Sequence, residues 1–133
     1  DGESHMELTC AFASNDGKEF IKEHFGESRY YYIYKVGENG ASFIKRIPNM
    51  SVEEEVHADP AKARSVASIL KEENVQVVVA RRFGPNIKRI RLKFAYLFLN
   101  TGTVEDGLKK VGESIGQLKD QLSKIAATKK TGD

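Results

Sequence analysis

The stretch VQVVVA at residues 75–80 constrains the fold more than any other part of the chain. A short apolar run without polar alternation predicts a strand that is covered on both of its faces. The stretch ELTCAFAS at residues 7–14 has the same character and is followed by NDG, a strong turn signal. A third strand is predicted at residues 93–99, KFAYLFL. The chain must therefore supply helices for both sides of a sheet.

Helical patterns separate these strands. Residues 59–73 open with Asp59 at the N-cap and Pro60 at the first helical position, which is a favourable helix start. A short helix is predicted for residues 85–91, and Thr103 is the predicted N-cap of the last helix. Helices between successive strands imply parallel pairing and right-handed crossovers.

The segments RYYYIYKV at residues 29–36 and ASFIKRI at residues 41–47 predict a β-hairpin, because both are rich in aromatic and β-branched residues and flank the turn sequence GENG. Its tyrosines could stack on single-stranded nucleic acid, but tyrosine on a sheet covered on both sides more often belongs to the core. Residues 48–58 form a predicted polar, acidic loop. The predicted fold class is α/β, with three α/β/α layers and a mixed sheet of about five strands that has the antiparallel hairpin at its edge.

The chain length and composition indicate one globular domain. Residues 1–6, DGESHM, resemble the remnant of an expression tag, residues 7–111 form the predicted domain, and residues 112–133 extend its last helix. A net charge of +2 argues against a nucleic-acid binder that depends on phosphate contacts. No apolar stretch is long enough to cross a membrane, and the single Cys10 excludes an internal disulfide, so we expect a cytoplasmic protein.

The tail carries an apolar stripe with heptad spacing. Its members are Val104, Leu108, Val111, Ile115, Leu118, Leu122 and Ile125. One interpretation is a single long helix that lays this stripe on its own sheet. The other is that the helix overhangs the domain and forms a homodimer through a coiled-coil seam.

One edge of the predicted sheet looks suited to a compact anion. The carboxyl ends of parallel strands meet at one edge, so the polar residues that follow each strand should lie together there. Two arginines and the backbone N–H groups of a helix that starts at a Gly-Pro turn would attract negative charge. The candidate binding residues are Asn15, Asp16, Gly17, Arg81, Arg82, Gly84, Pro85 and Asn86. Alternatively, the glycine only makes the turn and the arginines are solvated.

Other chemistries find less support. His24 and His57 could ligate a metal, although two histidines without fixed spacing are a weak signal. A two-metal hydrolase needs several converging carboxylates, and the later strand ends offer arginine and asparagine instead. No phosphate-binding loop or dinucleotide fingerprint is present, and Cys10 is expected to be buried and inert.

Four motifs in order, AFASNDG, EHFGESRYYYIY, VVVARRFGPN and TGTVEDGLKKV, resemble the dinitrogenase iron–molybdenum cofactor biosynthesis family, which includes nitrogenase cofactor carriers and the molybdenum–copper orange protein. The resemblance implies a ribonuclease-H-like fold and the non-catalytic binding or carriage of a metal–sulfur cluster, of Fe–S, Mo–Fe–S or Mo–Cu–S type. His24 matches the histidine of the family's His-Phe-Gly motif, and residues 84–86 match its Gly-Pro turn.

The chain departs from the family pattern at two places. Arg81 and Arg82 stand where many members have small residues, and the central loop keeps only His57 where many members are rich in histidine. The alternative function is therefore a regulatory or interaction module that dimerises or docks through its C-terminal helix without a cluster. In neither case do we expect an enzyme.

Overall fold

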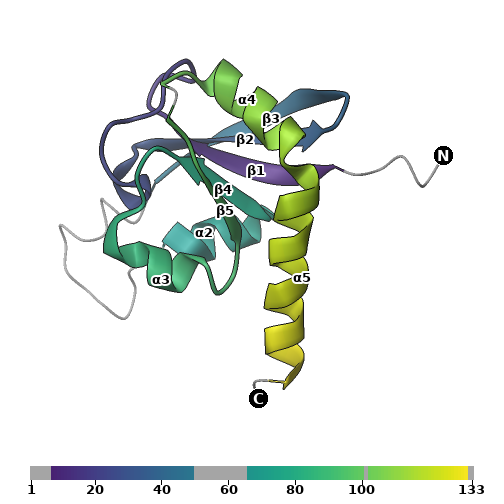
Figure 1. Ribbon diagram of the computed structural model, residues 1–133. Coiled ribbons are helices and arrows are strands. Elements are labelled where there is room, and N and C mark those ends of the chain that lie inside the picture. Colours follow the sequence, from purple (N-terminus) through teal and green to yellow (C-terminus); the bar gives the residue numbers. More distant parts are fainter. Residues whose placement is uncertain (1–6, 50–65, 101, 132–133) are drawn as a thin grey trace, which may run out of the picture.

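The computed structural model describes residues 7–49, 66–100 and 102–131, and Figure 1 shows their arrangement. Five strands form one sheet in the order β3-β2-β1-β4-β5. Their bounds are Leu8–Ala13 for β1, Tyr30–Gly37 for β2, Gly40–Pro48 for β3, Val77–Ala80 for β4 and Ala95–Phe98 for β5. β4 pairs in parallel with β1 and β5, whereas β2 pairs antiparallel with β1 and β3. The predicted mixed sheet with a hairpin at its edge is confirmed.

Both faces of the sheet are covered, as the apolar run at residues 75–80 predicts. Val78 and Ala80 belong to one core with α2 (Val66–Glu72) and α3 (Ile87–Ile90). Val77 and Val79 belong to the other core with α4 (Val104–Glu113) and α5 (Ile115–Thr131). Because successive side chains of a strand point to opposite faces, a strand between two helical layers needs apolar residues at every position.

The C-terminal segment differs from the prediction of one long helix. It breaks at Ser114, and Figure 1 shows α5 leaving α4 in a new direction and running past the end of the sheet. Ser114 caps α4 with φ −112° and ψ 14°, outside helical geometry. The change of direction lets Val111 on one helix and Leu118 on the other both reach the same core.

The heptad stripe packs on the chain's own sheet. Val104, Val111, Ile115 and Leu118 are buried there, and Leu108 and Leu122 are partly buried against them. The first interpretation of the stripe is therefore right over Val104–Leu122. The same positions cannot form a coiled-coil seam, so the structure gives no support to a homodimer through this helix.

Several element bounds differ from those expected. The helix predicted for residues 59–73 is described only from Val66, and its predicted start at Asp59 and Pro60 lies outside the described residues. The short helix predicted after Pro85 is a 3-10 turn, η3 (Gly84–Asn86), followed by the single turn of α3. Within the described ranges, no helix combines the length and apolar character needed to cross a membrane.

The free edge of β5 is closed by a side chain. The Gln121 amide of α5 accepts a hydrogen bond from the Tyr96 N–H at 3.1 Å and donates one to the Tyr96 carbonyl at 3.2 Å. These two bonds imitate a neighbouring strand, and an uncovered strand edge is a template for unwanted pairing. Gln121 therefore both attaches α5 and protects the sheet.

Replacing Gln121 by alanine should lower the free energy of unfolding by about 1–2 kcal/mol, because two partly buried backbone groups lose their partner. The variant should also self-associate more readily through β5. Urea denaturation and light scattering during size-exclusion chromatography measure the two effects. The exposed Gln117, on the same helix, provides the control Gln117→Ala. Equal behaviour of the two variants would contradict the role assigned to Gln121.

Candidate functional site

The three strand ends meet at one edge of the sheet, as the topology predicts. The Phe20 N–H donates to the Gly102 carbonyl at 2.7 Å, and the Val104 N–H donates to the Lys18 carbonyl at 2.9 Å, so the loops after β1 and β5 are joined. A methyl group added at Gly102 would lie 4.0 Å from Nη1 of Arg81, which places the loop after β4 beside them. We call the edge formed by residues 15–17, 81–86 and 102, together with His24, the rim.

The loop after β1 is held by its own polar side chains. Oδ1 of Asp16 accepts hydrogen bonds from the N–H groups of Lys18 at 2.8 Å and Glu19 at 3.0 Å. The bonds from Glu19 and Lys18 lower the pKa of the Asp16 carboxyl, because they favour its charged form. Oδ1 of Asn15 accepts from the Arg29 N–H at 2.9 Å.

Gly17 and Asp16 therefore shape this loop. Gly17 has φ +80°, and a Cβ there would come within 2.8 Å of the Tyr32 ring. Oδ1 of Asp16 accepts from the N–H groups of its own loop, and Oδ1 of Asn15 accepts from the Arg29 N–H. These bonds shape the loop, and the binding of an anion by residues 15–17 stays a prediction.

His24 and Gly84, which come from separate motifs, lie against each other. Gly84 has φ +68°, and a Cβ built there would lie 2.5 Å from Nδ1 and 2.7 Å from Cγ of His24. The imidazole ring therefore rests on the bare backbone of the Gly-Pro turn. Only glycine satisfies both the positive φ and this close approach.

The segment around His24 and the loop after β4 are also joined through Phe25. The Phe25 N–H donates to the Arg82 carbonyl at 2.7 Å. The rings of Phe25 and Phe83, both buried, have centroids 5.4 Å apart. These two contacts of Phe25, the residue next to His24, hold together the segments that carry His24 and Gly84, which are about sixty residues apart in the chain.

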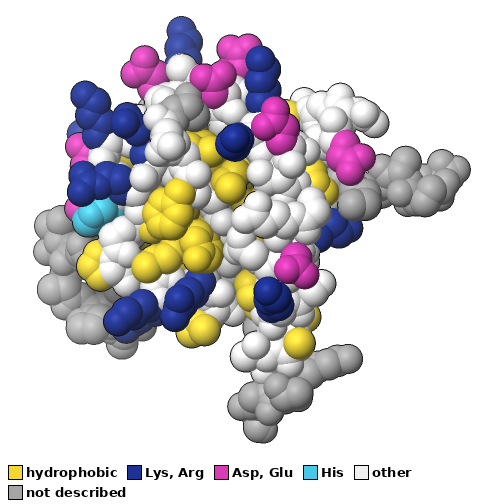
Figure 2. All heavy atoms as spheres, viewed as in Figure 1, with side chains coloured by type: hydrophobic (Ala, Val, Ile, Leu, Met, Phe, Trp, Pro, Cys, Tyr) yellow, Lys and Arg dark blue, Asp and Glu magenta, His cyan; other side chains and the backbone are white. Residues whose placement is uncertain are grey.

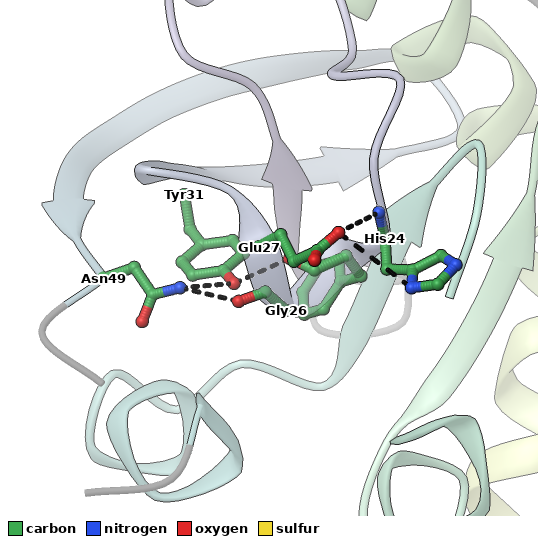
Figure 3. Close-up of polar contacts among 6 residues, drawn as sticks. His24, Gly26, Glu27, Tyr31 and Asn49 are labelled. Atoms are coloured by element: carbon green, nitrogen blue, oxygen red, sulfur yellow. Dashed lines mark hydrogen bonds and ion pairs between the residues drawn. The ribbon is translucent and has the colours of Figure 1, made fainter. Parts of the chain in front are cut away.

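Glu27 orients His24 from the other side. His24 is the N-cap of the 3-10 turn η2 (Phe25–Glu27). Oε1 of Glu27 accepts a hydrogen bond from the His24 N–H at 3.1 Å and lies 3.9 Å from Nδ1 of the ring, as Figure 3 shows. The His24 side chain is 40% exposed. Glu27 therefore holds the backbone of His24, while its carboxylate lies near the ring but beyond hydrogen-bond distance of Nδ1.

A buried polar network supports the η2 turn from below (Figure 3). The Asn49 amide donates to the carbonyls of Gly26 and Ser28, both at 2.9 Å, and to the Tyr31 hydroxyl at 3.1 Å. The Tyr31 hydroxyl in turn donates to the Phe25 carbonyl at 2.7 Å. Sequence reasoning missed Asn49, because it follows Pro48 in a segment predicted as a loop and carries no motif of its own.

Arg81 and Arg82 are exposed, and neither forms an ion pair within the part of the chain that the structure describes. Their charges are therefore available to a ligand. The N-terminus of the helix at Gly84 should attract an anion less strongly than predicted, since the segment from Gly84 to Ile90 contains only a 3-10 turn and one α-helical turn. Pro85 is exposed, and the side chain of Asn86 lies outside the description.

Few metal ligands gather at the rim. Among the described residues, no group of three or more His, Cys, Asp or Glu side chains could hold a metal ion. Burial strongly raises the pKa of the Cys10 thiol, whose Sγ donates to the Leu8 carbonyl at 3.5 Å inside the core, so the prediction of an inert cysteine agrees with its surroundings. His57 lies outside the described residues. Within them, His24 is the one histidine at the rim.

The chain is similar in sequence to one protein family and in fold to solved structures. The sequence profile of the family described as dinitrogenase iron-molybdenum cofactor matches residues 6–114. A crystal structure of a candidate dinitrogenase from Methanocaldococcus jannaschii superimposes with a TM-score of 0.60 at 16% identity, over 82% of this chain and 91% of that one. An NMR structure of a candidate dinitrogenase from Methanococcus jannaschii superimposes with a TM-score of 0.60 at 16% identity, over 81% of this chain and 89% of that one. At this identity, the structures establish the fold. No curated protein sequence matches the chain.

Proposed function

Because the chain belongs to the dinitrogenase iron–molybdenum cofactor family, we propose that it binds and carries an anionic metal–sulfur cluster, or a precursor of one, at the rim. The role is binding without catalysis. Fe–S, Mo–Fe–S and Mo–Cu–S clusters all share the compact negative charge that the rim suits.

One observation carries this proposal: the His24 ring is held on Gly84, in the same loop as Arg81 and Arg82, and neither arginine has a carboxylate partner among the described residues. Imidazole nitrogen is a common ligand of iron and other transition metals. Guanidinium groups stabilise anions by charge and by forked hydrogen bonds. A ligand and its countercharges therefore occupy the same edge of the sheet.

The donor set favours a cargo over a permanent cofactor. Iron–sulfur clusters that stay in a protein are held by several cysteine thiolates. Here the single cysteine lies in the core, and the described rim offers one imidazole. A cluster held by one protein ligand and by electrostatic attraction can be released to an acceptor.

Tetrathiomolybdate, a small metal–sulfur anion, tests the proposal. We expect uptake by the full chain to shift its visible absorption, with an affinity that falls about tenfold or more in Arg81→Ala/Arg82→Ala, because each guanidinium contributes a charge-assisted contact of roughly 1–3 kcal/mol. His24→Ala should change the absorption spectrum of the bound anion itself, since it removes the imidazole from the immediate surroundings of the anion. Absorption titration under anaerobic conditions measures both effects.

The control is Lys109→Ala/Lys110→Ala, which removes the same charge from exposed positions on α4. These substitutions should leave uptake within about twofold of the unchanged chain, apart from general charge screening. Equal losses in both double variants would show that net charge, rather than the rim, attracts the anion. An unaltered spectrum in His24→Ala would remove this histidine as a ligand.

The alternative of docking through the C-terminal helix is less well supported. From Val104 to Leu122 the apolar side of α4 and α5 packs against the chain's own core. An interaction role, if present, needs another surface.

A further inference from the structure

One stretch of the chain carries a strong excess of positive charge. Between Glu73 and Glu105 there are six Lys or Arg residues and no Asp or Glu. They are Arg81, Arg82, Lys88, Arg89, Arg91 and Lys93. The whole chain has a net charge of only +2, so the rest of it is acidic on balance. The segment contains residues 81–86 of the rim, α3 and β5, which are adjacent in space (Figure 1).

These six side chains are exposed, and none has an ion pair in the described parts of the chain. Elsewhere cations do pair: Lys45 lies 2.8 Å from Glu73, and Lys124 lies 3.5 Å from Asp120. Figure 2 shows Lys and Arg side chains with few acidic neighbours at the left and lower parts of this face, whereas Asp and Glu lie mainly towards its top and right, where further Lys and Arg side chains accompany them. Six cations without a carboxylate partner among the described residues favour a local positive potential, which attracts an acidic partner.

Apolar side chains lie among these charges. Phe98 is 56% exposed and Leu92 is 62% exposed, which makes them two of the four exposed large hydrophobic residues of the described chain. Figure 2 shows a hydrophobic cluster near the middle of the same face. The Phe98 ring meets Phe83 at 5.0 Å and Tyr96 at 5.7 Å, in both cases edge to face. Phe98 is therefore held in place although it faces solvent, as an interface anchor should be.

We propose that this basic–aromatic surface, made of the six cations with Leu92 and Phe98, docks an acidic segment of a partner protein that also presents apolar side chains. Exposed aromatic and arginine residues are typical of protein interfaces. Single-stranded nucleic acid fits less well, because Phe83 is buried under Phe98 and because Leu92 offers no ring on which a base could stack. The surface shares Arg81 and Arg82 with the rim, but the proposal does not depend on cluster binding at His24.

Two synthetic peptides and one oligonucleotide test the surface by NMR titration of the ¹⁵N-labelled full chain. The first peptide combines glutamate with leucine and phenylalanine, the second has the same charge but serine and glycine in place of the apolar residues, and the third probe is oligothymidylate of about 12 nucleotides. We expect saturable shifts in α3, β5 and the loop after β4 with the first peptide. The second should bind at least about tenfold more weakly, because it cannot cover Phe98 and Leu92.

Variants separate this surface from general charge and from the rim. The affinity for the first peptide should fall about tenfold or more in the double variant Arg89→Glu/Lys93→Glu and, separately, in Phe98→Ser. The matched control Lys109→Glu/Lys119→Glu makes the same change in net charge as Arg89→Glu/Lys93→Glu, at exposed positions on α4 and α5. It should lower the affinity for the first peptide by about twofold. Because Arg89, Lys93 and Phe98 lie outside the rim, these variants should change tetrathiomolybdate uptake no more than the control does, so docking and cluster binding can fail independently.

Three results would overturn the proposal. They are equal losses in the control and the surface variants, equal binding of the two peptides, and tighter binding of oligothymidylate than of the first peptide. The last result would assign the surface to nucleic acid. Circular dichroism of each variant excludes unfolding as the cause of lost binding, and a Phe98→Leu variant, which keeps an apolar side chain, should recover part of the affinity lost in Phe98→Ser.

Discussion

Replacing Gly84 by alanine is expected to destabilise the domain by about 1–3 kcal/mol and to displace His24 from the rim. Gly84 has φ +68°, which an L-residue adopts at a cost. The new methyl group would also start 2.5 Å from Nδ1 of His24, and no non-bonded pair of atoms tolerates that separation. Either the turn or the imidazole must move, and both changes alter the position of the ring on the rim.

Two measurements follow the effects of Gly84→Ala. Urea denaturation reports the free energy of unfolding, and the ring resonances of His24 report the displacement. The Gly84→Asn variant separates strain from collision, because asparagine tolerates positive φ better than alanine but carries the same Cβ. It should recover part of the stability, while His24 stays displaced and tetrathiomolybdate binding stays weak.

The control for this prediction is Gly116→Ala on α5. A Cβ at Gly116 meets no atom within 4 Å, so alanine there should be neutral or stabilise the helix by up to about 1 kcal/mol. If Gly84→Ala behaves like Gly116→Ala and leaves the His24 resonances unshifted, the contact between ring and turn has no importance in solution.

Replacing Asn49 by alanine should lower the free energy of unfolding by about 2–4 kcal/mol. Asn49 is 5% exposed, and its amide donates to two carbonyls and to the Tyr31 hydroxyl. Alanine leaves these buried acceptors without their donor, and each unsatisfied group costs about 1–3 kcal/mol. The η2 turn should loosen and His24 should become more mobile, although neither Asn49 nor Tyr31 touches its ring.

A double-mutant cycle with Tyr31→Phe tests whether the network acts as one unit. The tyrosine change removes the hydroxyl that donates to the Phe25 carbonyl and accepts from Asn49. Coupled residues should give an interaction energy of about 0.5–3 kcal/mol in the cycle. The exposed Asn39 in the hairpin turn supplies the control Asn39→Ala, which should change stability by about 0.5 kcal/mol or less. Additive losses would show two independent contacts instead of a network.

Much of the architecture could be predicted from local patterns. Three features were predicted correctly: the strand at Val77–Ala80, the hairpin around residues 37–40 and the N-cap at Thr103. They could be predicted because strand, turn and cap preferences act over a few residues. The convergence of three strand ends then followed from the rules of parallel pairing. Placing Arg81 beside Gly102 needed only that topology.

The details of the site could not be predicted in the same way. His24 rests on Gly84 and Asn49 supports the η2 turn through contacts between segments far apart in the sequence, and no local period records such contacts. The apolar stripe of the tail predicted one straight helix. The break at Ser114 arises because the helices must follow the core around the end of the sheet.

By itself, the order of residues determined the strands, the crossovers and the edge where polar residues collect, since these depend on short-range preference and on chain connectivity. Only the packed domain decided which cations lack an ion pair among the described residues, which histidine meets a glycine, and how Gln121 closes the edge of β5. Those outcomes depend on distances of a few ångströms between side chains, and such distances exist only after the layers have packed.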